Sequence, residues 1–268
     1  PVASAQVKSS ILLAGLFAQG DTVLDELTPT RDHTELMLRE MGVRVETSGR
    51  HIVLHPPRLP FPSLDIEVPG DMSGAAFFLV AGAVHPQAVI EVANVGMNPG
   101  RSGILEVLQA MGARLTVKNR RLVGQEPVAD IVVESSLLEG TEIGGDMVPR
   151  VIDEIPVLAV AAALARGTTV IRDAAELRVK ESDRIATAVE ALRKLGADVE
   201  ERADGMVVHG GRTLNGAVCS SHGDHRLAMA VAVAGLAARG ETVISGSDAA
   251  DISYPGFWRE LERLGAGD

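Results

Sequence analysis

Aromatic residues and cysteines are scarce in this sequence. Phe, Trp and Tyr make up only 3% of the 268 residues, whereas 46% of the residues are hydrophobic, so small aliphatic side chains have to build the core. A core of that size suits one large domain or two smaller ones. Cys219 is the only cysteine, which excludes an intrachain disulfide and fits a reducing compartment, so a cytoplasmic location is expected.

The sequence also lacks a long apolar run and an excess of positive charge. Its longest apolar stretch, residues 227–238, is far shorter than the roughly 20 residues of a membrane-spanning helix. The chain has 36 acidic residues against 25 Lys and Arg, a net charge of −11. This balance disfavours nucleic-acid and membrane partners, so an anionic ligand would need a local cationic pocket.

One pattern occurs four times along the chain. Each copy has a small-residue apolar helix, a turn, a short β-branched strand and an amphipathic helix that ends at a glycine, a common helix C-cap. A strand pair follows in the first three copies. The sequence therefore predicts an α/β fold of the α+β type, built from repeated βαβαββ units of roughly 70 residues. The first helices are expected at residues 6–19, 73–84, 155–166 and 226–239.

A proline-rich stretch marks the expected boundary between two lobes. Four prolines between residues 56 and 62 disfavour helix and regular strand pairing. We expect residues 1–69 to form one incomplete unit of an N-lobe, and residues 70–268 to form a C-lobe of three units, the last incomplete. Because the first copy lacks its opening strand, a further N-terminal segment is expected to precede it.

Polar residues open the first helix of every copy. A helix N-terminus presents free N–H groups and a partial positive charge, which suit phosphate or carboxylate, although Ser and Asp are also ordinary N-caps there. Capping does not explain Lys8 or Arg226, because a cation near a helix N-terminus opposes the helix dipole. An anionic ligand is therefore expected beside these two cations.

Two clusters of charged residues stand out. Residues 178–184 read RVKESDR, and a helix that starts within them would place Lys180 and Arg184 on one face and let Glu181 pair with Arg184. Residues 223–229 read GDHRLAM. Taken alone, each cluster also fits a capped helix start whose charged side chains point to solvent.

Together, the two clusters resemble signature motifs of the 5-enolpyruvylshikimate-3-phosphate synthase family. Residues 2–9 (VASAQVKS), 31–35 (RDHTE) and 153–156 (DEIP) resemble three more motifs, in the family's order. The resemblance implies the enolpyruvyl transferase fold. It also implies a monomeric transferase that moves the enolpyruvyl group of phosphoenolpyruvate to the 5-hydroxyl of shikimate 3-phosphate and releases phosphate. Neither a metal nor an organic cofactor is implied.

The resemblance also assigns the site residues. It implies that Asp153 contacts the shikimate hydroxyls, that Glu181 donates and accepts the proton at the methylene carbon, and that Lys180 serves both binding and catalysis. Arg184 and Arg226 match the residues that clamp phosphoenolpyruvate, since Arg suits bidentate capture of carboxylate and phosphate. The substrate-binding residues implied are Ser4, Gln6, Arg31, Asp153, Lys180, Arg184, His225 and Arg226.

Two features depart from the family pattern. The family's N-terminal Lys-Ser pair, an Arg of the same lobe and a Gly-rich phosphoenolpyruvate loop have no counterpart in the sequence, so the chain alone is expected to be inactive. Ile252 stands where many members have a Lys, two residues before an aromatic-Pro pair. One cation for phosphoenolpyruvate is therefore expected to be missing or replaced.

Two other functions stay open. A sister enzyme, UDP-N-acetylglucosamine enolpyruvyl transferase, shares the repeat, but residues 224–229 (DHRLAM) are similar to the shikimate enzyme and not to its sister. A non-catalytic repeat module that binds an anionic partner would need no ordered acid–base set. Asp153 and Glu181 argue against that second alternative.

Overall fold

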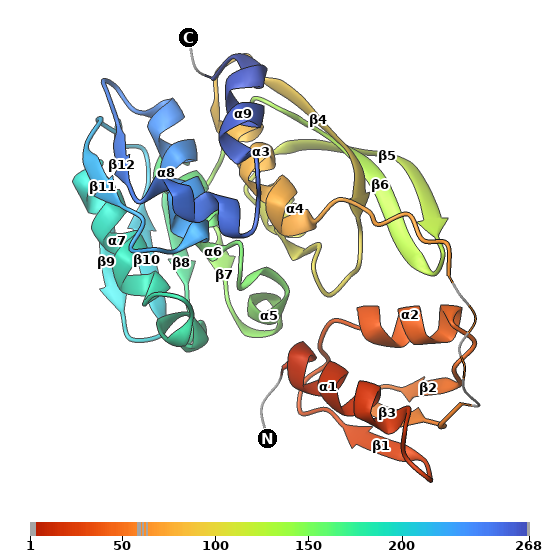
Figure 1. Ribbon diagram of the computed structural model, residues 1–268. Helices are drawn as coiled ribbons and strands as arrows, with labels where there is room; N and C mark the ends of the chain where they lie inside the picture. Colours follow the sequence, from red (N-terminus) through yellow and green to blue (C-terminus); the bar gives the residue numbers. More distant parts are fainter. Residues whose placement is uncertain (1–3, 58–59, 61, 63, 267–268) are drawn as a thin grey trace.

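A computed structural model describes residues 4–57, 60, 62 and 64–266, which form four α/β units (Figure 1). The first two residues of the motif at residues 2–9 therefore lie outside the described residues. The first unit has its own antiparallel sheet, in the order β1-β3-β2, and its own small hydrophobic cluster around Leu12 and Ile52. Its elements are α1 (Ala5–Gly15), β1 (Thr22–Asp25), α2 (His33–Glu40), β2 (Val45–Ser48) and β3 (His51–Leu54).

The second unit builds a longer antiparallel sheet in the order β4-β6-β5. Its expected opening strand is reduced to a single parallel bridge between Gly70 and Val95. The apolar face of the sheet lies against α3, where a Cβ on Gly82 would meet Val133 Cγ1 at 2.6 Å, so only glycine allows this approach. The elements are α3 (Met72–Val84), β4 (Val89–Gly96), α4 (Gly103–Ala110), β5 (Arg114–Val123) and β6 (Glu126–Glu134).

The third unit contains the four-stranded sheet β7-β8-β10-β9, in which β7 opens the unit and runs parallel to β8. The other strand pairs of this sheet are antiparallel. The elements are β7 (Glu142–Ile143), η1 (Gly145–Met147), α5 (Val148–Val151), α6 (Ile155–Leu164), β8 (Thr168–Ile171), η2 (Ala175–Val179), α7 (Arg184–Lys194), β9 (Asp198–Arg202) and β10 (Gly205–His209).

The fourth unit is shorter, with two parallel strands and a small final helix. The predicted amphipathic helix is reduced to five α-helical residues followed by a π turn that contains a left-handed glycine, Gly265. The elements are β11 (Val218–Ser220), α8 (His225–Ala237), β12 (Val243–Ser245), η3 (Ser247–Ile252), α9 (Phe257–Leu261) and η4 (Glu262–Ala266).

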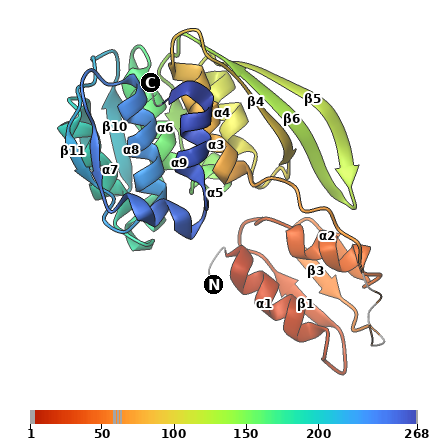
Figure 2. The same cartoon turned by 45° about the horizontal axis from the view of Figure 1, so that its top comes forward.

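The inner helices α3, α6 and α8 pack against one another in pairs and form the centre of the large core (Figure 2). Every residue of α6 from 155 to 163 is buried, which accounts for its Ala- and Val-rich composition, because small side chains let helices approach closely from all sides. No helix in the described part of the chain is both long and apolar enough to cross a membrane.

The first unit contacts the second through polar side chains. Asn98, which is buried, donates to Asp32 Oδ1 at 2.7 Å, and His33 pairs with Glu126. These contacts hold the start of α2 against the loop between β4 and α4. They place the segment that carries Arg31 beside the third unit, whose helix starts carry most of the predicted site.

Candidate functional site

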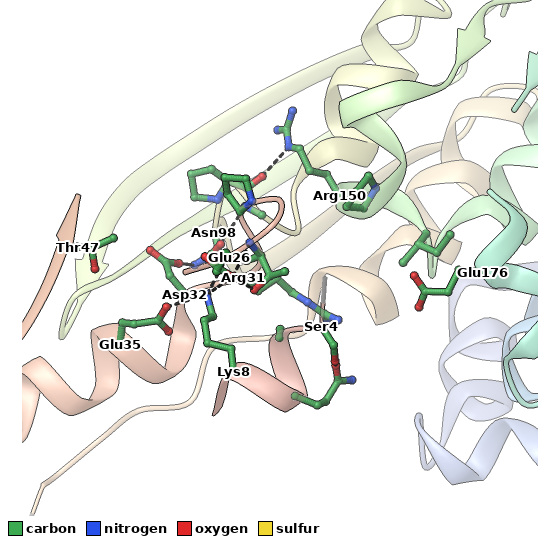
Figure 3. A pocket seen from close by; sticks show the side chains of 18 of the residues that line it. Ser4, Lys8, Glu26, Arg31, Asp32, Glu35, Thr47, Asn98, Arg150 and Glu176 are labelled. Atoms are coloured by element: carbon green, nitrogen blue, oxygen red, sulfur yellow. Dashed lines mark hydrogen bonds and ion pairs between the residues drawn. The ribbon is translucent and has the colours of Figure 1, made fainter. Parts of the chain in front are cut away.

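Eight of the nine side chains predicted for the site line one cavity of about 300 Å³. It lies where the first unit meets the N-termini of α6, α7 and α8. Ser4, the ninth, lines an adjoining cavity of about 390 Å³, which also reaches Gln6, Arg31 and Lys180 (Figure 3). The eight are Gln6, Arg31, Asp153, Lys180, Glu181, Arg184, His225 and Arg226.

Arg184 is the most deeply embedded cation of the cavity. Its side chain is 2% exposed, and it donates from Nε to Asp224 Oδ2 at 2.8 Å and from Nη2 to Glu181 Oε2 at 2.6 Å. A third, longer contact joins Nη1 to Asp153 Oδ1 at 3.3 Å. The predicted pair with Glu181 is therefore present, and any anionic ligand has to share Arg184 with these carboxylates.

The prediction that Lys180 and Arg184 share one face of a helix is wrong. Helix α7 begins only at Arg184, because the carboxylate of Asp183 accepts from the backbone N–H of Ala186 at 3.0 Å and caps the helix there. Lys180 lies outside the helix, just after η2, and its Nζ donates to Glu176 Oε1 at 2.6 Å. Both cations still line the cavity, but from different elements.

Asp153 lies among the cations, just before α6. Burial alone would raise the pKa of this carboxyl, but the attraction of Arg226, Arg184, Lys180 and Arg31 outweighs it, so the pKa of Asp153 lies below its ordinary value. The side chain is therefore a carboxylate throughout the neutral range. It can accept hydrogen bonds from hydroxyl groups of a ligand.

His225 and Arg226 are buried at the first turn of α8, so the interpretation that they point to solvent is wrong. Asp224 caps this helix by accepting from Arg226 N at 2.9 Å. Burial, and then the charge of Arg226, lower the pKa of His225, so its imidazole is neutral at neutral pH. Nε of Arg226 is buried and has no hydrogen-bond partner in the described residues, while Nη1 lies 3.9 Å from Glu154 Oε1.

Lys8 was expected to face an anionic ligand; its side chain lines the adjoining cavity of about 390 Å³, but two carboxylates already pair with it. Its side chain is 5% exposed, and Nζ pairs with Glu35 at 2.7 Å and with Glu26 at 3.2 Å. Nζ also donates to the carbonyl oxygen of Thr30. Two carboxylates of the same unit therefore account for a cation near the N-terminus of α1.

The remaining predicted residues lie on the first unit. Ser4 caps α1 by accepting from Val7 N at 3.4 Å and donates to Gln6 Oε1 at 3.2 Å. Arg31 makes no ion pair with any described residue. Burial, and then the charge of Arg101, lower its pKa, although a guanidinium stays charged.

Ile252 is 71% exposed in η3 and does not line the cavity. No cation of the lining comes from that position, since the four cations are Arg31, Lys180, Arg184 and Arg226. Within the described ranges, no group of three or more His, Cys, Asp and Glu side chains is arranged to hold a metal ion.

Sequence reasoning missed the buried polar neighbours of Arg226. Ser73 and Glu154 are among the polar residues that open the first helices of the repeats, and Ser73 Oγ donates to Glu154 Oε1 across two units. Arg101 Nη2 in turn donates to Ser73 Oγ at 2.7 Å. The only signal in the sequence was that equivalent positions of the repeats carry polar residues.

Comparison with known proteins identifies the family of the chain. Two curated 3-phosphoshikimate 1-carboxyvinyltransferases, from Salinibacter ruber and Desulforamulus reducens, are each 55% identical over 98% of the chain. The solved EPSP synthase from Acinetobacter baumannii is 45% identical, with a TM-score of 0.93, which confirms the predicted fold class. The chain spans 61% of the length of each of these proteins. Since residues 1–261 match the family described as EPSP synthase (3-phosphoshikimate 1-carboxyvinyltransferase), the chain belongs to that family.

Proposed function

We propose that this chain carries the pocket in which the enolpyruvyl group of phosphoenolpyruvate is transferred to the 5-hydroxyl of shikimate 3-phosphate, with release of phosphate. One observation carries the proposal: two carboxylates and four cations meet in a single cavity at the N-termini of three helices. Cations outnumber carboxylates there, and helix N-termini add partial positive charge, so the cavity favours ligands with several negative charges.

The roles in the reaction follow from the charge and exposure of each side chain. Asp153 stays ionised, so it can accept hydrogen bonds from the ring hydroxyls and accept the proton of the attacking 5-hydroxyl. Glu181 is half exposed at the mouth of the cavity, where its carboxyl can exchange a proton with the methylene carbon of phosphoenolpyruvate. Arg226 and Lys180 both line the cavity, so their charged ends can bind the anionic groups.

We propose that residues 1–69 belong to one lobe and residues 70–268 to the other. The separate sheet and hydrophobic cluster of the first unit support this division. With the cavity at their junction, closure of the lobes would exclude water and strengthen every electrostatic contact inside. A monomeric, cytoplasmic enzyme fits the family resemblance and the single cysteine.

Phosphate release tests the proposed function. The protein to measure is this chain joined to the part of the Salinibacter ruber relative that it does not match, hereafter the completed protein. We expect phosphate to be released only when phosphoenolpyruvate and shikimate 3-phosphate are both present, and no turnover from the 268-residue chain alone. Release with UDP-N-acetylglucosamine in place of shikimate 3-phosphate, or release that survives Asp153→Asn unchanged, would contradict the proposal.

A second prediction concerns the pair between Lys180 and Glu176. Because the carboxylate of Glu176 holds Lys180 Nζ at 2.6 Å, an anionic ligand has to compete with it. Glu176→Gln should therefore strengthen sulfate binding by the chain, by roughly two- to fivefold, the range of a partly exposed ion pair worth up to about 1 kcal/mol. Isothermal titration calorimetry measures this effect.

Glu190→Gln is the matched control for this experiment. Glu190 pairs with Lys194 at 2.7 Å with the same spacing of four residues, but neither side chain lines the cavity. The control should leave sulfate affinity unchanged. Equal affinities for the two variants would show that Glu176 does not compete for Lys180.

A further inference from the structure

A chain of hydrogen bonds that starts in the second unit ends at Glu154, beside Arg226. Arg101 Nη2 donates to Ser73 Oγ at 2.7 Å, and Ser73 Oγ donates to Glu154 Oε1. The same oxygen of Glu154 lies 3.9 Å from Arg226 Nη1. Arg101 is itself held by the carboxylate of Asp71, the N-cap of α3.

This chain runs through the centre of the three inner helices. Ser73 is in the first turn of α3, Glu154 immediately precedes α6, and Arg226 is in the first turn of α8. Ser73 is 2% exposed, Glu154 4% and Arg226 9%. Because the three helices pack in pairs, residues from three different units meet at one point behind the cavity.

Glu154 differs from the other carboxylates near the cavity. It does not line the cavity, so it has no direct contact with a ligand there. Burial raises its pKa, and the hydrogen bond from Ser73 and the charge of Arg226 offset only part of that rise. A buried carboxyl is costly unless it is paired, so its place beside an incompletely paired Arg226 calls for a specific role.

We infer that Glu154, itself held in place by Ser73, is a positioning residue that holds Arg226 against the cavity and controls the charge of Arg226 by its own ionisation. The inference rests on the proposed function in one respect only, that Arg226 is a cation for the anionic substrate. When Glu154 is protonated, the full charge of Arg226 faces the cavity. When Glu154 is ionised, part of that charge is neutralised from behind.

The first test is the side-chain Hε–Nε signal of Arg226 in nuclear magnetic resonance spectra of the 268-residue chain. Loss of the signal in Arg226→Lys assigns it. We expect Glu154→Gln, Glu154→Ala and Ser73→Ala each to shift it. Glu35→Gln, which removes an equally buried carboxylate beside Lys8, should not. An unshifted Arg226 signal in both Glu154 variants would overturn the inference, whether or not a ligand binds.

The second test separates position from charge, with sulfate as the probe because it does not titrate near neutral pH. Gln and Ala remove the same charge, but only Gln keeps the side chain that reaches Ser73 and Arg226. Glu154→Ala is therefore expected to bind sulfate about tenfold more weakly than Glu154→Gln. A tenfold change in affinity is the same free energy as a shift of one pKa unit. Equal affinities would contradict a positioning role. Amide spectra of both variants check that they fold.

The pH dependence of sulfate binding completes the test. Affinity of the unmodified chain should fall as pH rises through the pKa of Glu154, and the ratio of Glu154→Gln affinity to unmodified affinity should rise by up to about tenfold. The charged groups that act on Glu154 are Arg226, Asp153 and Arg101, with Arg31 nearby. His225 gains its proton in every variant, so it cancels in this ratio. A ratio that is constant with pH would overturn the charge control.

Sulfate binding and the Arg226 signal together show whether the role of Glu154 or the anion pocket itself is wrong. If Arg226→Lys abolishes sulfate binding but the Glu154 variants bind like the unmodified chain, the inference fails and the anion pocket stands. If no variant binds sulfate and the Arg226 signal still shifts as expected, Glu154 positions Arg226 and the pocket assignment fails.

Discussion

Glu181→Gln in the completed protein is expected to lower kcat by about 10²–10⁴-fold, the usual contribution of a general acid–base group. Gln has the shape of Glu but cannot carry a proton to or from the methylene carbon. The KM for shikimate 3-phosphate should change by no more than a few-fold, because Asp153, Gln6 and Arg31 stay in place. Steady-state phosphate release with varied shikimate 3-phosphate gives both constants.

Two features make this substitution a clean test. Glu181 is half exposed, so Gln brings little change in packing. Arg184 loses one partner but keeps Asp224 at 2.8 Å and Asp153 at 3.3 Å. Glu190→Gln, on the outer side of α7, should leave kcat unchanged. Turnover by Glu181→Gln within a few-fold of the unmodified protein would remove Glu181 from the proton transfer.

Arg184→Ala is expected to lower the free energy of unfolding of the 268-residue chain by about 3–5 kcal/mol, the cost of removing one partner of a buried ion pair. Arg184 is 2% exposed and Asp224 is fully buried, so the carboxylate of Asp224 would remain in the interior without its main partner. Denaturant unfolding followed by circular dichroism measures the change.

Two further variants show whether the uncompensated carboxylate is the cause. Arg172→Ala removes an Arg that is paired with Glu142 and Asp173 on the surface, so it should cost no more than about 1 kcal/mol. Adding Asp224→Asn to Arg184→Ala removes the charge left behind, so the double variant should be more stable than Arg184→Ala. If Arg184→Ala costs as little as Arg172→Ala, the buried pair does not hold α7 to α8.

Local signals made much of the fold predictable from the sequence. Gly42, Gly112, Gly196 and Gly265 were expected to end helices, and all four have left-handed φ angles between 77° and 90°. The helix and strand pattern was equally local, since hydrophobic periodicity and turn residues act within one unit. The fourth unit departs most from its prediction, because its last helix keeps only five α-helical residues.

The residues that the family resemblance singled out do meet at one cavity, whereas partners that come from distant segments were much harder to predict. The sequence around Lys8 does not indicate that Glu26 and Glu35 are its partners. Several polar residues before Arg184 could have capped α7, and the sequence did not show which one would. In the structure Asp183 is the cap, so the helix begins at Arg184. The buried hydrogen bond from Ser73 to Glu154 forms only because three helices pack together. Hydrophobic periodicity does not specify that packing, so the hydrogen bond could not be predicted.

A crystal structure of the completed protein with bound shikimate 3-phosphate would show directly whether the substrate occupies this cavity. We expect the ring hydroxyls at the carboxylate of Asp153, and the phosphate group near Ser4, Gln6 and Arg31, where the cavity at the starts of α6, α7 and α8 adjoins the one that Ser4 lines. Shikimate 3-phosphate bound elsewhere, for example in the separate cavity of about 410 Å³ lined by Pro69, would contradict it.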